Sequence, residues 1–185
     1  MSNIVGISLI SDLFEDKSIK EVVSNPDEKE GNINIMALYF EDYHVGQEFV
    51  TKARTITETD IVNYAAFSWD TNPLHTDKEF ARNSIFGERI AHGMLGIVVH
   101  SGLSQRLGIM EGTILAFLGM TWKFHIPIRI GDTVHVVQRV KEMHEGEKPD
   151  RGVLTFEKEL INQKGEIIQT GTTTVLLKKR SFRES

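Results

Sequence analysis

The sequence contains no cysteine, which excludes disulfide bonds, thiolate metal sites and cysteine nucleophiles. It also lacks any run approaching the roughly 20 apolar residues that a helix needs to cross a bilayer. The N-terminal residues do not combine a basic start with a long apolar stretch, so a secretory signal is not expected. These absences predict a cytoplasmic protein that is not inserted in a membrane.

Basic residues are not in excess, because 21 Lys and Arg stand against 26 Asp and Glu and the formal net charge is −5. Nucleic-acid-binding proteins usually present a basic face, so nucleic acid is not an expected partner. A local basic patch on an acidic protein can still bind an anionic ligand. With 185 residues, 40% of them hydrophobic, the chain can form the core of one domain.

The composition divides the chain into three parts. Residues 1–36 are predicted to be a partly disordered N-terminal appendage, because the polar run Asn25–Gly31 interrupts any regular pattern. Residues 37–180 are predicted to form the folded domain, and residues 181–185 a tail.

Helices are predicted in the first half of this domain. Thr57 and Asp60 have the spacing of a capping box, and the helix that they begin must end near Trp69, ahead of Asn72-Pro73. The first half of a later stretch that begins at Gly93 is apolar on every face, which is typical of a buried helix. The predicted helices cover residues 57–69, 78–83 and 93–107.

Strands dominate the second half of the domain and indicate the fold class. Short turns between consecutive strands favour an antiparallel sheet, and helices that segregate from strands favour an α+β fold. One long helix wrapped by such a sheet is the arrangement called a hot-dog fold. The predicted strands cover residues 49–55, 114–128, 132–140, 152–161 and 166–177.

The segment Asp70–His75 is the first candidate for chemistry. A carboxylate and an imidazole lie five residues apart with Pro73 between them, and an extended or turn segment of this length can direct both into one pocket. Such a pair can move protons to and from a substrate through one water. The same residues are also a good turn sequence, and taken alone such a segment is structural roughly four times in five.

A second candidate is Gly93, at the start of the apolar helix. A glycine there leaves its N–H free, and the positive end of the helix dipole adds to the local field. A thioester carbonyl on this N–H would be stabilised as it becomes an enolate, as in an oxyanion hole. Tight packing of helix against sheet is the alternative explanation, favoured about two to one on spacing alone.

The remaining histidines do not indicate a metal site. None of them forms a ligand spacing such as two histidines at positions i and i+4. His92 and His100 flank the apolar helix and are interpreted as satisfied core histidines. The others are His44, His125, His135 and His144.

Both candidate segments together, in this order, resemble the MaoC-like family of (R)-specific enoyl-CoA hydratases. The likeness rests on Asp70-Thr71-Asn72-Pro73-Leu74-His75 and on the later His92-Gly93-Met94. It continues in Ser101-Gly102-Leu103 and in Phe124–Asp132, and covers roughly residues 39–179. The joint match is far more specific than either segment alone.

The resemblance implies an activity and a set of site residues. Asp70 and His75 would be the catalytic dyad, the Gly93 N–H would hold the thioester oxygen, and Asn72, Met94 and Ser101 would contact the substrate. The family adds water across a trans-2-enoyl-CoA or removes it from an (R)-3-hydroxyacyl-CoA. No metal or other cofactor is implied, since coenzyme A is part of the substrate. The resemblance also implies a homodimer or a higher homo-oligomer.

Alternatives to a hydratase remain open at this point. A hot-dog thioesterase usually has its carboxylate on the central helix, and residues 94–105 contain neither Asp nor Glu. A non-catalytic acyl-CoA-binding module would retain the motifs without turnover. An acyl group on a carrier protein would change only the partner. Trp69 departs from the small residue that many family members have before the Asp, and leaves the acyl chain length and branching open.

Overall fold

In the computed structural model, the structure describes residues 37–183. The predicted N-terminal appendage lies outside the described residues. A 3-10 turn, η2 (Phe40–Asp42), precedes two short strands and four helices. The strands that precede the helices are β1 (Glu48–Val50) and β2 (Arg54–Thr55). The helices are α2 (Glu58–Ser68), α3 (Pro73–Thr76), α4 (Lys78–Arg82) and α5 (Gly93–Gln105).

Four long strands complete the domain and form most of its sheet. They are β3 (Ile114–Phe124), β4 (Thr133–Glu145), β5 (Arg151–Ile161) and β6 (Ile167–Lys178). The strand order is β1-β4-β5-β6-β3, with β2 also paired to β4, and every pairing is antiparallel. Gly165, with a φ of +78°, closes the predicted turn between β5 and β6, as only glycine does without strain.

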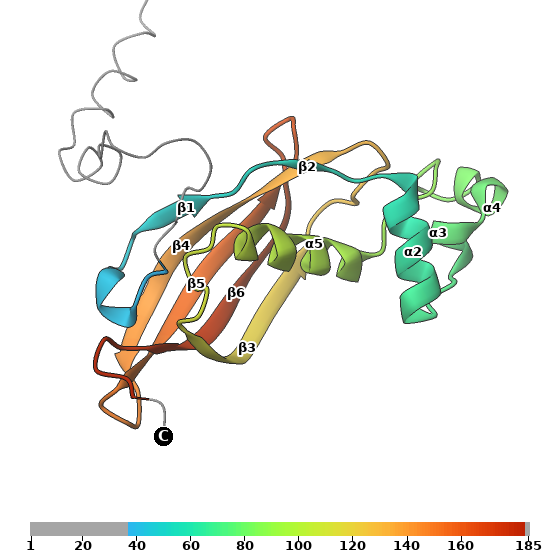
Figure 1. The fold of residues 1–185 in the computed structure, drawn as a ribbon. Coiled ribbons are helices and arrows are strands. Elements are labelled where there is room, and N and C mark those ends of the chain that lie inside the picture. Colours follow the sequence, from blue (N-terminus) through green and yellow to red (C-terminus); the bar gives the residue numbers. More distant parts are fainter. Residues whose placement is uncertain (1–36, 184–185) are drawn as a thin grey trace, which may run out of the picture. The chain divides into compact units, whose positions relative to one another are not determined.

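The sheet curves around α5, which lies along its inner face (Figure 1). Leu95, Val99 and Leu103 lie on one stripe of α5 and pack into the core. A second cluster of buried residues gathers around Tyr43 and Phe156 and includes side chains from β4, β5 and β6. The predicted α+β arrangement, an antiparallel sheet wrapped around one long helix, is therefore confirmed.

Several predicted boundaries differ from the structure. The predicted strand 49–55 is broken into β1 and β2, and the strand predicted for 114–128 ends at Phe124. The expectation that the first half of α5 is buried on every face is wrong for this chain, because Met94 and Val98 are 55% and 56% exposed. Among the described residues, no helix is long and apolar enough to cross a membrane.

Candidate active site

The carboxylate of Asp70 is placed by the end of α2. Thr57 caps this helix and forms the predicted capping box with Asp60. The helix stops at Trp69, whose φ of 62° lies in the left-handed region and turns the chain away from the helix axis. The Asp70 N–H donates to Ser68 Oγ at 3.2 Å, and Asp70 Oδ1 accepts from the Asn72 N–H at 3.3 Å. Asp70 is thus held in a short turn, with its side chain exposed.

His75 lies on the short helix α3, not on the extended or turn segment that the sequence predicted. Asn72 caps this helix by accepting the Leu74 N–H at 2.9 Å, and Pro73 occupies the first helical position, where its missing N–H has no cost. The Nδ1 atom of His75 lies 2.8 Å from the carbonyl oxygen of Ile90. Because a carbonyl only accepts, Nδ1 carries the proton and Nε2 is left free for a substrate or a water.

His92 completes a cluster with the two predicted residues. One ligand-type atom from each of Asp70, His75 and His92 lies within 4.8 Å of the other two. The rings of His75 and His92 have their centroids 3.8 Å apart, and His92 Nε2 lies 2.9 Å from the Asp70 carbonyl oxygen. Burial lowers the pKa of His92, opposed by this hydrogen bond and assisted by the nearby His75. His92 is thus buried, as the sequence predicts, but it is not fully satisfied, because its Nδ1 has no hydrogen-bond partner among the described residues.

Such a cluster also contains the residue types that bind divalent metals. Two of its ring nitrogens are already engaged, His75 Nδ1 by Ile90 and His92 Nε2 by Asp70. The atoms that remain are the Asp70 carboxylate, His75 Nε2 and His92 Nδ1. The absence of a metal from the reaction therefore stays a prediction, which a chelator can test.

Gly93 begins α5 next to this cluster, with His92 as the residue that precedes the helix. Among the described residues, no acceptor is bonded to its N–H, as expected in the first turn of a helix. A Cβ atom at this position would lie only 3.0 Å from Cε1 of Phe124, so the glycine keeps the helix start open. Gly93 and His75 line one cavity of about 280 Å³, together with Phe124, Pro127 and Gln169.

The other predicted substrate contacts do not line this cavity. Asn72 is exposed and serves as the cap of α3. Met94 is exposed at the start of α5, and Ser101 lies two turns further along, where it lines a second cavity. Trp69 is 88% exposed and fills neither cavity. The roles of Asn72, Met94 and Ser101 remain predictions.

The comparison with known sequences decides the family. The MaoC like domain matches residues 41–161, about two thirds of the chain. The chain belongs to the MaoC-like family. This MaoC-like chain is 36% identical over 143 residues to the (R)-specific enoyl-CoA hydratase of Rhodospirillum rubrum, covering 77% of this chain and 93% of that protein. It is 36% identical over 110 residues to the 3-hydroxybutyryl-CoA dehydratase of Methylorubrum extorquens, covering 59% and 68% of the two.

Solved structures agree with the sequence relatives. The MaoC-like dehydratase from Rhodospirillum rubrum superposes on the MaoC-like chain with a TM-score of 0.73 at 29% identity, covering 79% of this chain and all of that one. A Mycobacterium tuberculosis protein with a double hotdog fold gives a TM-score of 0.70 at 18% identity, covering 83% of this chain and 48% of that one. The MaoC-like chain therefore has a hot-dog fold, as predicted.

Proposed function

We propose that this chain is a carbon–oxygen lyase that interconverts trans-2-enoyl-CoA and (R)-3-hydroxyacyl-CoA. The observation that carries the proposal is the cluster at the head of α5. There, Asp70 and His75 lie within 4.8 Å of each other, and His75 shares a cavity with the free N–H of Gly93. Relatives named enoyl-CoA hydratase and 3-hydroxybutyryl-CoA dehydratase support it.

The geometry suits the addition of one water to an enoyl thioester. A separation of up to 4.8 Å between the Asp70 and His75 atoms leaves room for a water that hydrogen-bonds to both. In the proposed step, the water oxygen bonds to C3, one water proton passes to the dyad, and the dyad returns a proton to C2. Asp70 and His75 share that proton, and the roles of acid and base belong to the pair.

Gly93 contributes the second part of the proposed mechanism. The thioester oxygen gains negative charge as water adds to C3, and the Gly93 N–H at the positive end of α5 would stabilise that charge. His92 would help to position the pair, because its Nε2–H donates to the Asp70 carbonyl oxygen and its ring packs against the ring of His75. No metal is needed for this step.

Hydration of crotonyl-CoA tests the proposal. The reaction is followed as loss of the enoyl thioester absorbance and as formation of (R)-3-hydroxybutyryl-CoA. We expect Asp70→Asn and His75→Gln each to lower kcat by about 10²- to 10⁴-fold, the usual contribution of general acid–base catalysis. Glu79→Gln, an exposed carboxylate on α4, is the matched control and should keep full activity. Activity should also survive dialysis against a chelator. An equally active Asp70→Asn would remove the dyad from the mechanism.

A thioesterase is the competing activity within this fold. Release of the free CoA thiol, detected with a thiol reagent, would identify it. The helix α5 offers no carboxylate for such a reaction, because its polar side chains are those of one histidine, two serines and one glutamine.

The hydration assay with an acyl-carrier-protein thioester in place of the CoA thioester shows which of the two carriers the chain accepts. An acyl-CoA-binding module would bind the substrate and release neither product.

We also infer that the enzyme works as a homodimer. In the described sheet, β3 has a neighbour on one side only, β6, and so leaves an edge unpaired. Exposed apolar side chains, among them Phe117, Leu118 and Met120, lie on this strand. An unpaired apolar edge favours pairing with another copy of the chain.

A further inference from the structure

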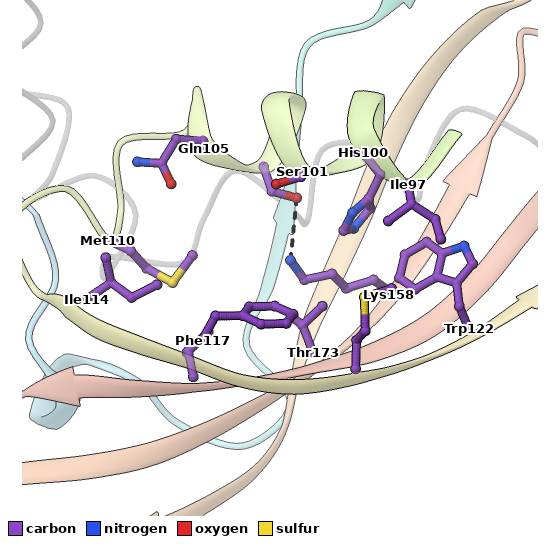
Figure 2. A pocket seen from close by; sticks show the side chains of 13 residues that line it. Ile97, His100, Ser101, Gln105, Met110, Ile114, Phe117, Trp122, Lys158 and Thr173 are labelled. Carbon is purple, nitrogen blue, oxygen red and sulfur yellow. Dashed lines mark hydrogen bonds between the residues drawn. The ribbon is translucent and has the colours of Figure 1, made fainter. Parts of the chain in front are cut away.

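A second cavity, separate from the one that Gly93 lines, lies beneath α5 (Figure 2). It encloses about 160 Å³ between this helix and strands β3, β5 and β6. Its walls are largely apolar, with Ile97 on the helix and Phe117 and Trp122 on β3. Trp122, which lines this cavity, donates through Nε1 at 2.9 Å to Gln169, which lines the cavity at Gly93.

The side chain of Lys158 enters this apolar cavity. It comes from β5, in the interior of the sheet, and Figure 2 shows it extended beneath α5 with its nitrogen toward the helix. Lys158 is only 4% exposed. Its ammonium lies 3.5 Å from Ser104 Oγ and 5.4 Å from the centre of the Phe156 ring. Within the described part of the chain, no carboxylate forms an ion pair with it.

An ammonium buried without a counter-charge is unfavourable, because it loses its hydration and gains nothing comparable in return. Burial accordingly lowers the pKa of Lys158 to about 8, which still leaves the group mostly protonated at neutral pH. The neighbouring Glu157 and Glu159 cannot compensate, because alternate residues of a strand point to opposite faces of the sheet. The cavity therefore presents a buried cation with which an anionic group of a bound molecule can pair.

Other polar atoms around Lys158 are unpaired as well. Thr173 Oγ1 and His100 Nε2 both belong to residues that line the cavity, and both are buried without a hydrogen-bond partner among residues 37–183. Gln138, directly opposite Lys158 in the β4–β5 pair, has both side-chain amide atoms buried and unpaired. Buried polar groups are hydrogen-bonded in the great majority of cases, so the Thr173 and His100 atoms are available to a polar group of a bound molecule.

We propose that the second cavity receives the acyl chain of the substrate and that Lys158 binds a carboxylate at the far end of that chain. The preferred substrate would then be the CoA monothioester of an unsaturated dicarboxylic acid. This inference rests on the proposed function, since it places the thioester at Gly93. Ser104 Oγ and Thr173 Oγ1 supply further donors to the carboxylate.

The helix sets the length of this substrate. Ser104 lies eleven residues beyond Gly93 on α5, a rise of about 16 Å. About 3 Å at each end is taken up by the hydrogen bonds to the Gly93 N–H and to Lys158. An extended chain advances about 1.2 Å per bond, so the remaining distance fits roughly eight to ten carbons.

Matched pairs of substrates test the inference. Each pair has the same length, from roughly six to twelve carbons, and ends in either a carboxylate or a methyl group. We expect the wild-type chain to prefer the carboxylate by at least about 10-fold in kcat/KM, the usual strength of a hydrogen bond to a charged group. In Lys158→Met, which removes the charge and keeps most of the side-chain volume, the preference should disappear or reverse. Lys141→Met, an exposed lysine on β4, is the control and should keep it.

Binding of saturated analogues gives a second measurement that does not require turnover. Calorimetry should show octanedioyl-CoA binding about 10- to 100-fold more tightly than octanoyl-CoA to the wild type, and no such gap in Lys158→Met. A preference for the methyl-ended substrates, or an unchanged preference in Lys158→Met, would overturn the inference. Failure of the proposed function looks different, because the wild type would then hydrate neither crotonyl-CoA nor either member of any pair.

Discussion

At the scale of single residues, the burial of His100 links the stability of the fold to pH. His100 faces the second cavity, its ring meets Trp122 edge to face at 4.7 Å, and its Nε2 has no partner. Burial, with Lys158 nearby, lowers the pKa of this ring from 6.5 to about 3. The folded chain thus keeps His100 neutral at pH values where the unfolded chain protonates it.

The sign of the resulting pH dependence follows from proton binding. Between about pH 6.5 and pH 3, the unfolded state binds more protons than the folded state, so the free energy of unfolding falls as the pH is lowered. We expect His100→Gln to flatten that fall by about 1.4 kcal/mol per pH unit within this window. Urea denaturation at a series of pH values measures it. Parallel curves for the variant and the wild type would contradict the assignment.

The sequence identified some of the site residues and missed others, for physical reasons. Asp70 and His75 could be found because a proline turn keeps them close along the chain. The contacts of His92 and the burial of Lys158 could not be predicted, since both depend on what lies beside these residues in space. Lys158 follows the alternating pattern of β5 at a position where an apolar residue is expected. The sequence alone does not indicate that the side chain of Lys158 is buried.

At the scale of secondary structure elements, Gln169 connects the start of α5 to the sheet. Its Nε2 donates to the Gly93 carbonyl at 3.0 Å, and its Oε1 accepts from Trp122. The side chain fits because Gly96 lies against it, and a Cβ at position 96 would come within 2.4 Å of Nε2. The position of the helix start, and of the Gly93 N–H with it, therefore depends on a glycine one turn away.

Two glycine substitutions on the same helix separate this contact from helix propensity. We expect Gly96→Ala to lower the free energy of unfolding by about 1–3 kcal/mol, because Gln169 must move in a packed core. Gly102→Ala should raise it by about 0.5–1 kcal/mol, since its Cβ would enter open space and alanine favours helix. Urea midpoints of both variants check this. Equal shifts in the same direction would show that the contact with Gln169 is unimportant.

Element boundaries were predicted best where local chemistry sets them. The capping box at Thr57 and the turn at Gly165 are local signals, and both lie where the sequence indicates. The helix α3 was missed because its four residues show no hydrophobic period. The break between β1 and β2 was missed because it depends on Thr51 Oγ1, which accepts the Val136 N–H from the opposite strand.

At the scale of the whole molecule, the unpaired edge at β3 predicts the assembly. Leu118 on this strand is 52% exposed, and Val62 on α2 has the same exposure. We expect Leu118→Lys to convert the dimer to a monomer, or to weaken it at least about 10-fold, since a lysine on an edge strand opposes pairing. Val62→Lys should leave the dimer intact. Sedimentation of both variants is the measurement, and a wild-type chain that sediments as a monomer would refute the prediction.

In the described domain, the proposed catalytic pair and the buried lysine lie on separate parts of the chain. Asp70 and His75 belong to the helical segment ahead of α5, whereas Lys158 belongs to the middle of the sheet. Under the proposed function, exchange of a few side chains on β5, β6 and α5 would therefore alter which acid is accepted. The proton chemistry would be inherited unchanged, so that one scaffold can serve successive metabolic roles.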